Sequence, residues 1–353
     1  MAEDRNVVPG FGSDNQAGVL PEVMAALVAA NAGSSRAYGA DPWTARATKR
    51  LRERFGGDAQ VAFVFGGTGA NVVALLAALR PHEAVLAADC AHLAVDECGA
   101  PERIVGCKVV QVPAPGGKLS VESLRPHIAH RGDVHRAQPR VLSISQSTEW
   151  GTVYRLEEVR ALAEFAHAEG MLLHLDGARL ANAAAALDLP LEAFGREAGV
   201  DLLSFGGTKA GLLFGEAVVA WDRAVAERLP FARKQATQLP SKLRFVAAQF
   251  EALLEGDLWM RAARHANRMA ARLAARLERL PGVALEHPVE ANAVFARVPR
   301  DWIAPLAERN LVGVWERDRD LVRLMTAWDT RPEEVEALVD ALPATWDAPA
   351  PSS

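Results

Sequence analysis

The chain has 353 residues, of which 50% are hydrophobic and 24% are charged, a composition typical of a soluble globular protein large enough for two domains. A formal net charge of -5 gives no electrostatic reason to expect a nucleic-acid or anionic-membrane partner. Neither a secretory signal nor a membrane span is expected. Three cysteines, Cys90, Cys98 and Cys107, include no CxxC pair, so no zinc site or disulfide framework is predicted and a reducing cytoplasm is the expected location.

The N-terminal part of the chain predicts two turns around one helix. A polar turn at residues 11–15 precedes an apolar periodic segment at residues 19–30. Ser13 in that turn fits either a helix N-cap or a hydroxyl group that holds a carboxylate, since hydroxyl donors at a chain reversal serve both purposes. A second, exposed turn at residues 37–42 contains Tyr38.

A glycine-rich turn at residues 66–69 joins a predicted strand, residues 61–65, to a predicted apolar helix, residues 70–79. Free backbone N–H groups at the positive end of a helix dipole form a ready anion site. The turn is not a Walker loop, because no Gly-Lys-Ser/Thr follows, and it is not a dinucleotide fingerprint, because Val72 replaces the third glycine. It therefore predicts either a phosphate site or a tight turn without a ligand.

Two further strands are each followed by a titratable side chain. Residues 85–88 lead to His92, and residues 141–145 lead to Glu149. His92 fits a structural hydrogen-bonding residue as well as a catalytic one. Glu149 fits an exposed loop carboxylate as well as a site residue.

A strand–helix–strand pattern then places an aspartate and a lysine together. The apolar runs at residues 171–175 and 200–205 predict parallel strands joined by helical crossover structure. Asp176 follows the first strand and Lys209 follows the second, so both leave the sheet at one edge. In open α/β sheets this edge is where ligands bind.

The chemistry of Asp176 and Lys209 admits two interpretations. A plain ion pair would account for the two residues alone. The glycines at 206 and 207 would also let a planar ligand approach the backbone. In pyridoxal phosphate enzymes a lysine carries the aldehyde as a Schiff base, and an aspartate is the usual partner of the pyridinium nitrogen.

The C-terminal third has a different pattern of predicted elements. A long helical stretch, residues 245–279, precedes short alternating strands and helices, at residues 293–298, 302–309, 321–327 and 332–342. This pattern predicts a large domain over residues 1–245, including an N-terminal arm, and a smaller α+β domain over residues 246–345. Residues 346–353 are rich in Pro, Ala and Ser and are expected to be a disordered tail.

Taken together, the motifs from residue 11 to about residue 342 resemble those of the low-specificity L-threonine aldolases. These are pyridoxal phosphate enzymes of the aspartate-aminotransferase fold type, known as fold type I. The resemblance rests on an ordered set of motifs: Ser13-Asp14-Asn15, Ala37-Tyr38-Gly39, Gly66 to Asn71, Ala91-His92, Asp96 to Pro101, Asp176 to Arg179, and Ser204 to Gly211. It implies a PLP-dependent transferase fold with a mostly parallel sheet in the large domain and a smaller C-terminal α+β domain.

The resemblance also implies roles in cofactor binding. Lys209 would be the Schiff-base lysine, and Asp176 would face the pyridine nitrogen. His92 would stack on the cofactor ring, and Gly67 with Thr68 would bind the phosphate.

Other implied roles concern the substrate and a second subunit. Arg179 would contact both the cofactor and the substrate carboxylate, and Ser13 and Arg323 would help to hold that carboxylate. Tyr38, for the substrate, and Lys242, for the cofactor, would reach the site from a neighbouring subunit, because family members have sites at a dimer interface within a homotetramer.

Two positions depart from the family pattern. Many relatives have a histidine where Glu149 stands, so the base is open between His92, Glu149 and an ordered water. Ala210 replaces an asparagine often found directly after the lysine, and both flanking glycines remain.

The expected activity is retro-aldol cleavage of L-threonine, L-allo-threonine and related L-β-hydroxy-α-amino acids to glycine and an aldehyde. A preference for aromatic substrates, as in a phenylserine aldolase, is the first alternative. A β-eliminating lyase or an aminotransferase on the same fold is the second. A non-catalytic module that binds cofactor or phosphate is disfavoured, because it would not need to keep Lys209, Asp176 and two arginines.

Overall fold

The computed structural model describes residues 10–344, and the chain divides into two compact units. The large unit is Val19–Met260, and the small unit combines Met1–Gly18 with Arg261–Ser353. The sequence had placed the boundary at residue 245 and the N-terminal arm with the large domain. The compact units divide instead after Met260, and the N-terminal segment groups with the small unit. The predicted tail at residues 346–353 lies outside the described residues.

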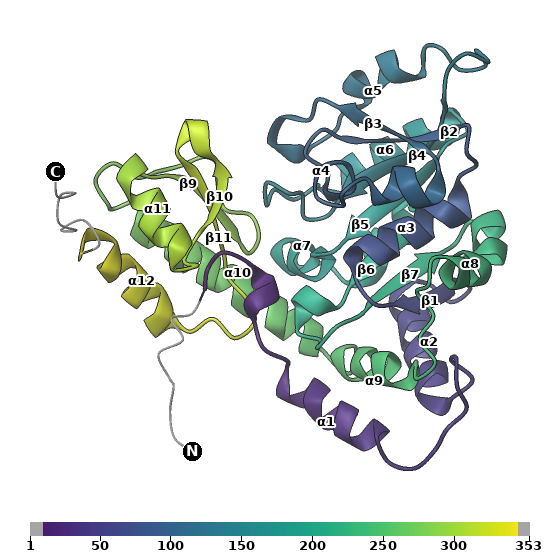
Figure 1. Ribbon diagram of the computed structural model, residues 1–353, viewed down its shortest axis with the longest axis horizontal. Coiled ribbons are helices and arrows are strands. Elements are labelled where there is room, and N and C mark those ends of the chain that lie inside the picture. Colours follow the sequence, from purple (N-terminus) through teal and green to yellow (C-terminus); the bar gives the residue numbers. More distant parts are fainter. Residues whose placement is uncertain (1–9, 345–353) are drawn as a thin grey trace. The chain divides into compact units, whose positions relative to one another are not determined.

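The large unit contains a seven-stranded sheet in the order β1-β7-β6-β5-β4-β2-β3 (Figure 1). Strand β7 is antiparallel to both of its neighbours, and all other pairs are parallel. The mostly parallel sheet that the sequence predicted is therefore confirmed. The strands are β1 (Gln60–Val64), β2 (Glu83–Ala88), β3 (Lys108–Val112), β4 (Gln138–Ser145), β5 (Leu172–Gly177), β6 (Leu202–Gly206) and β7 (Glu216–Ala220).

Helices cover the central strands of this sheet, which explains why those strands are almost wholly apolar. Every residue of β5, β6 and β7 is buried. Helix α3 (Gly67–Ala78) packs on β6, on β7 and on α8 (Arg223–Gln235). Helix α6 (Leu156–Ala168) packs on β5, and α7 (Leu180–Leu187) packs on β5 and β6. The other helices are α1 (Pro21–Ala30), α2 (Pro42–Phe55), α4 (His92–Val95), α5 (Val121–Ile128) and α9 (Arg244–Leu253).

The helical stretch predicted over residues 245–279 is interrupted. Helix α9 ends at Leu253, and α10 (Leu258–Leu277) begins four residues after Leu254. Between them Gly256 has a φ of 57°, in the left-handed region that favours glycine and cannot continue a helix. The two units divide within α10, after Met260. Among the described residues, no helix has both the length and the apolar character needed to cross a bilayer.

The small unit is an antiparallel sheet in the order β10-β11-β9-β8, packed with helices. Its strands are β8 (Ala284–Leu285), β9 (Ala293–Arg297), β10 (Gly313–Glu316) and β11 (Leu321–Met325), and its helices beyond α10 are α11 (Arg300–Glu308) and α12 (Pro332–Ala344). The predicted smaller α+β part of the chain is thus present.

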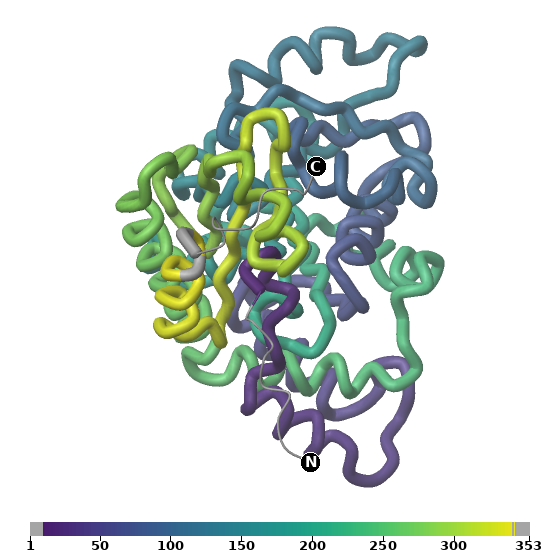
Figure 2. Tube along the Cα trace, turned by 60° about the vertical axis from the view of Figure 1, so that its left-hand side comes forward, coloured from purple at the N-terminus to yellow at the C-terminus, as the bar shows by residue number. Residues whose placement is uncertain are grey.

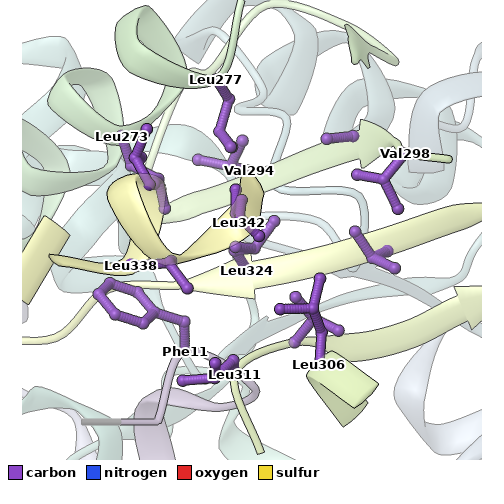
Figure 3. Close-up of a cluster of buried hydrophobic side chains, with 14 of the residues drawn as sticks. Phe11, Leu273, Leu277, Val294, Val298, Leu306, Leu311, Leu324, Leu338 and Leu342 are labelled. Carbon is purple, nitrogen blue, oxygen red and sulfur yellow. The ribbon is translucent and has the colours of Figure 1, made fainter. Parts of the chain in front are cut away.

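The N-terminal segment belongs to the small unit because of Phe11. This side chain is 2% exposed and lies in the small unit's apolar core, with Leu324 and Leu338 among its members (Figure 3). The N–H of Met325 donates to the carbonyl of Phe11 at 2.6 Å, and Trp328 Nε1 donates to Gly18 at 3.0 Å. Figure 2 shows the purple segment running beside the yellow-green strands.

This packing makes Phe11 a test of where the N-terminal segment belongs. We expect Phe11→Ala to lower the free energy of unfolding by about 3–5 kcal/mol, because the substitution leaves a cavity in a core. Urea unfolding followed by circular dichroism measures the loss. Phe231→Ala is the matched control, since that phenylalanine is 72% exposed. Equal stability of the two variants would contradict the assignment.

Candidate active site

The carboxyl ends of the parallel strands meet at one edge of the large unit's sheet. Strand pairing places Ser145 of β4 beside Asp176 of β5, and Asp176 beside Ser204 of β6. Strand β2, which precedes His92, is parallel to β4. Strand β1 runs in the direction of β6, because both are antiparallel to β7, so the glycine-rich turn lies at the same edge. The expected convergence of these strand ends is therefore confirmed.

Asp176 is a buried carboxylate at the end of β5, and protein donors occupy both of its oxygens. Oδ1 accepts the N–H of Ala178 at 3.0 Å, and Oδ2 accepts Nδ2 of Asn71 at 2.8 Å. Asp176 as a whole residue is 6% exposed. Asn71 reaches Asp176 from the first turns of α3, so the helix and the strand end are tied together by this bond.

The same amide nitrogen of Asn71 holds a second carboxylate. It donates to Oε1 of Glu97 at 2.8 Å, and that oxygen lies 2.9 Å from Nδ1 of His92. We call His92, Glu97, Asn71 and Asp176 the four-residue network. The centre of this network is shielded from solvent, because the side chain of Glu97 is fully buried. The side chain of His92 is 40% exposed.

The electrostatics of the network favour the charged form of His92. The hydrogen bond to Glu97 is the largest cause that raises the pKa of His92 above its ordinary value of 6.5, and the charges of Asp176 and Glu97 act in the same direction. Burial and the positive charge of Lys209 oppose the rise. The imidazole is thus a stronger base than a free histidine, with Nδ1 already engaged.

Glu149 supports the backbone of His92. Its Oε1 accepts the N–H of His92 at 2.9 Å and the hydroxyl of Ser145 at 2.6 Å. Its Oε2 is shielded from solvent and has no hydrogen-bond partner among the described residues. Burial raises the pKa of this carboxyl, and the bonds from Ser145 and His92 oppose that rise. The interpretation of Glu149 as an exposed loop residue was wrong.

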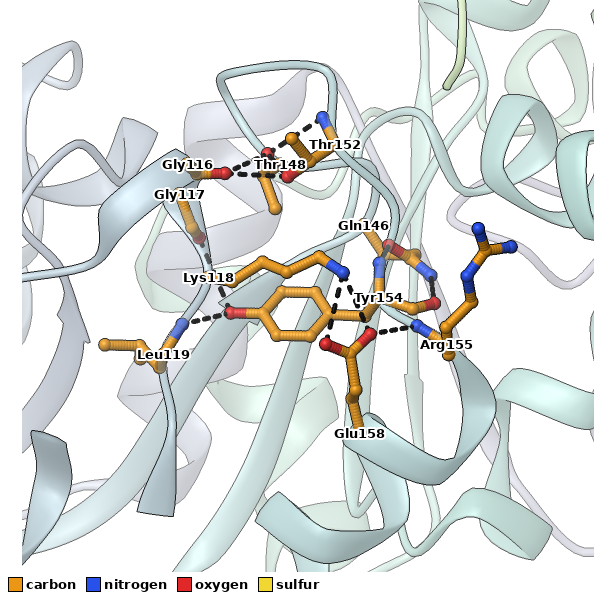
Figure 4. Close-up of polar contacts among 10 residues, drawn as sticks. All are labelled: Gly116, Gly117, Lys118, Leu119, Gln146, Thr148, Thr152, Tyr154, Arg155 and Glu158. Carbon is orange, nitrogen blue, oxygen red and sulfur yellow. Dashed lines mark hydrogen bonds and ion pairs between the residues drawn. The ribbon is translucent and has the colours of Figure 1, made fainter. Parts of the chain in front are cut away.

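The loop that carries Glu149 is held by a second set of polar contacts (Figure 4). Gln146 makes two hydrogen bonds to the backbone of Tyr154, at 2.8 and 3.0 Å. The phenol oxygen of buried Tyr154 accepts the N–H of Leu119 at 2.6 Å. Nearby, Lys118 Nζ pairs with Glu158 Oε2 at 2.8 Å. These bonds fix Glu149 relative to β4.

Lys209 lies in a short 3-10 turn, Thr208–Ala210, directly after β6. Its charge acts on His92 and on the buried carboxyl of Glu216. Packing within the protein gives Gly206 and Gly207 a further reason to be glycine, because a Cβ at Gly206 would collide with the backbone of Ala178 and one at Gly207 with the backbone of Gly215. The approach of a planar ligand at these glycines stays a prediction.

The glycine-rich turn leaves the start of α3 open. Helix α3 begins at Gly67, and its N-cap, Gly66, supplies no side-chain cap. A Cβ at Gly66 or at Gly67 would meet nothing within 4 Å. Thr68 follows and is partly exposed. The space beside Gly66 and Gly67 at the start of this helix is therefore open, which suits an anion site.

The remaining predicted residues fall into three places. Arg179 is the N-cap of α7, three residues after Asp176. Tyr38 is exposed, and its N–H donates at 2.9 Å to the carbonyl of Ser241, next to exposed Lys242.

Ser13 and Arg323 lie together in the small unit. The hydroxyl of Ser13 accepts the N–H of Asn15 at 3.2 Å, so the N-cap interpretation holds for the turn. Arg323 Nη2 donates to the carbonyl of Gly12, adjacent to Ser13, at 3.2 Å.

Several known proteins are similar to this chain. A family model described as β-eliminating lyase matches residues 10–300. The low-specificity L-threonine aldolase of Pseudomonas aeruginosa is 43% identical over 329 residues, which cover 93% of this chain and 95% of that protein.

The chain belongs to the low-specificity L-threonine aldolases. The solved structure of Leishmania major threonine aldolase is similar with a TM-score of 0.89 and 33% identity, covering 95% of this chain and 98% of that one. A Thermus thermophilus aspartate aminotransferase variant aligns with a TM-score of 0.70 at 18% identity, covering 95% of each chain, which shows the fold alone. Membership of this family and fold type I are therefore confirmed.

The site of this aldolase family member fits pyridoxal phosphate. Asp176 offers a buried carboxylate for a protonated ring nitrogen. The open start of α3 at Gly67 offers N–H donors for a phosphate, and Lys209 supplies an amine at the same edge.

Sequence reasoning missed three residues of the site: Asn71, Glu97 and Glu216. Asn71 and Glu97 stand within the motifs shared with the aldolases, but no role had been assigned to them. Asn71 carried a usable signal, because it is the one polar residue among apolar residues 70–79. The sequence around Glu216 contains no such signal, because the role of Glu216 depends on which strands pair.

The four-residue network predicts a shift in the titration of His92. In Glu97→Gln the pKa of His92 should fall, because the main cause of its rise is removed. The rate of diethyl pyrocarbonate modification of His92 in the cofactor-free protein, measured by mass spectrometry against pH, reports the neutral imidazole. His92→Asn identifies the modified site. An unchanged midpoint would contradict the role of Glu97.

Proposed function

We propose that this chain cleaves L-threonine and related L-β-hydroxy-α-amino acids to glycine and an aldehyde, with pyridoxal phosphate as cofactor. One observation carries the proposal. In a chain of this family, Lys209 and the four-residue network, which includes Asp176, lie at one edge of the sheet. Bound pyridoxal phosphate supplies a sink for the electron pair released when the Cα–Cβ bond breaks.

In this proposal the large unit binds the cofactor with three groups. The Lys209 amine would hold the cofactor covalently. Asp176 holds the proton of the ring nitrogen, and its existing bonds to Asn71 and Ala178 fix its position. The N–H groups at Gly67 and Thr68 bind the phosphate with the positive end of the α3 dipole.

His92 is the proposed base. Its Nδ1 is engaged by Glu97, which leaves Nε2 to take the proton from the substrate β-hydroxyl. The hydroxyl oxygen then becomes the carbonyl oxygen of the aldehyde as the Cα–Cβ bond breaks, and a proton returned to Cα gives glycine. Glu149 is less suited to this task, because its Oε1 already accepts two hydrogen bonds and its Oε2 is shielded. An ordered water remains the second alternative.

The other roles stay predictions that rest on the resemblance. These are carboxylate binding by Arg179, Ser13 and Arg323, and contributions of Tyr38 and Lys242 to a neighbouring subunit's site. We likewise propose that the protein forms a homotetramer with sites at a dimer interface. Its proposed location is the cytoplasm. Support for subunit association comes from the exposure of two apolar side chains of α1, Met24 at 45% and Val28 at 72%.

The reaction is tested by aldehyde release. Acetaldehyde from L-threonine and benzaldehyde from L-phenylserine should both appear when pyridoxal phosphate is added, and neither should appear with Lys209→Ala. The ratio of the two rates decides between an aliphatic and an aromatic preference. Keto-acid formation without aldehyde would contradict the aldolase proposal and favour transamination or elimination.

Asp176→Asn separates cofactor binding from electron withdrawal. Asparagine keeps one acceptor where two donors, Asn71 and Ala178, now bind, and it has no charge to keep the ring nitrogen protonated. We expect the variant to take up pyridoxal phosphate, measured by absorbance, and to lose at least about 10²-fold in kcat. Near-normal turnover with bound cofactor would reject this assignment.

A further inference from the structure

A buried carboxylate binds the turn that carries Lys209, and this carboxylate has no part in the mechanism proposed above. Glu216 is the first residue of β7 and is 7% exposed. Its backbone pairs with Val64 of β1 on one side and with Gly206 of β6 on the other. Because β7 is antiparallel to both neighbours, its beginning lies at the edge where β1 and β6 end.

The carboxylate of Glu216 binds the residues that lead into Lys209. Its Oε2 accepts the N–H of Gly207, and the carboxylate also accepts the hydroxyl and the backbone N–H of Thr208. Thr208 Oγ1 in turn accepts the N–H of Gly215 at 3.1 Å. The turn Thr208–Ala210 has no cap from its own N-cap residue, Gly207. Glu216 therefore supplies, from another strand, the acceptor that the start of this turn lacks.

The surroundings of this carboxylate are apolar apart from these partners. Phe250 and Val246 of α9 and Leu212 lie against Gly207 and Gly215, which flank it. Burial is the largest cause that raises the pKa of Glu216, to about 7, and the hydrogen bonds from Gly207 and Thr208 and the positive charge of Lys209 oppose that rise. The charge of Lys209 also acts on His92.

We propose that Glu216 is the positioning residue of Lys209, in that its carboxylate caps the lysine's turn and its negative charge acts on the lysine amine. This inference rests on the proposed function only in that Lys209 must bind pyridoxal phosphate. The charge favours the protonated nitrogen at Lys209, and the cap fixes where that nitrogen lies. Glu216 contacts neither substrate nor cofactor in this role.

The test uses the cofactor-loaded enzyme and Glu216→Gln, which keeps the shape and an acceptor but removes the charge. The visible absorbance of the bound cofactor is titrated against pH, since it reports protonation of the nitrogen that joins Lys209 to the cofactor. We expect the midpoint of Glu216→Gln to fall by about one pH unit. The unsubstituted enzyme should show a transition broader than a single site, because two interacting groups titrate together.

Two further variants separate charge from placement. Thr208→Val removes one hydrogen bond to Glu216 but keeps the charge, so its midpoint should stay near that of the unsubstituted enzyme. Glu216→Asp keeps the charge on a shorter arm, so it should preserve the midpoint while slowing covalent trapping of cofactor on Lys209 by borohydride. Trapping is quantified by the mass of the Lys209 peptide, and the melting temperature of the cofactor-free protein reports folding.

The outcomes are decisive either way. A Glu216→Gln midpoint and trapping rate equal to those of the unsubstituted enzyme would overturn the inference. If Glu216→Gln does not fold, Glu216→Asp decides, with slower trapping at an unchanged midpoint supporting the inference and unchanged trapping overturning it. Trapped Lys209 without aldehyde release would reject the proposed reaction alone, whereas no trapped Lys209 in the unsubstituted chain would reject both.

Discussion

One amide group holds the centre of the site together. The side-chain nitrogen of Asn71 gives one hydrogen to Glu97 and the other to Asp176, at 2.8 Å each. Two buried carboxylates in one region repel each other, and the amide of Asn71 gives each of them a hydrogen-bond donor. Because Asn71 belongs to α3, whose first residues form the glycine-rich turn, the same helix orients the acid partners and the proposed phosphate donors. His92, bound through Glu97, depends on this bridge as well.

Several carboxylates lie at this edge of the sheet, and hydrogen bonds from the protein stabilise them there. Asp176, Glu97, Glu149 and Glu216 each accept protein N–H or O–H donors, and Lys209 and His92 are the groups at this edge that can carry positive charge. An excess of anionic groups in a poorly solvated region stabilises added protons. A pyridinium nitrogen and an imidazolium are the charged species that the proposed reaction requires, so the charge balance suits that chemistry.

The strands were predictable from sequence where an apolar run ended at glycine or a charged residue. The runs ending near Asp176 and Lys209 are examples, and their parallel pairing followed from the helical connection between them. The regular Ala, Arg and Leu spacing runs on across Gly256, so it hid the break between α9 and α10. The place of Phe11 could not be predicted, because its partners, Leu324 and Met325, lie at the other end of the chain. Spacing likewise gave no sign that Asn71 contacts Asp176, since no local pattern links the two positions.

The site residues lie on turns too short to be stable by themselves, and two carboxylates from neighbouring strands compensate. His92 begins the four-residue helix α4, whose N-cap, Ala91, has no side chain able to accept the first N–H groups; Glu149, after β4, accepts the N–H of His92 instead. Lys209 lies in a three-residue turn whose N-cap is Gly207, and Glu216, at the start of β7, accepts the N–H groups there. Helix ends need acceptors for these groups, and isolated helices of this length are unstable. The carboxylate at position 149 therefore has a structural reason that does not require it to act as the base.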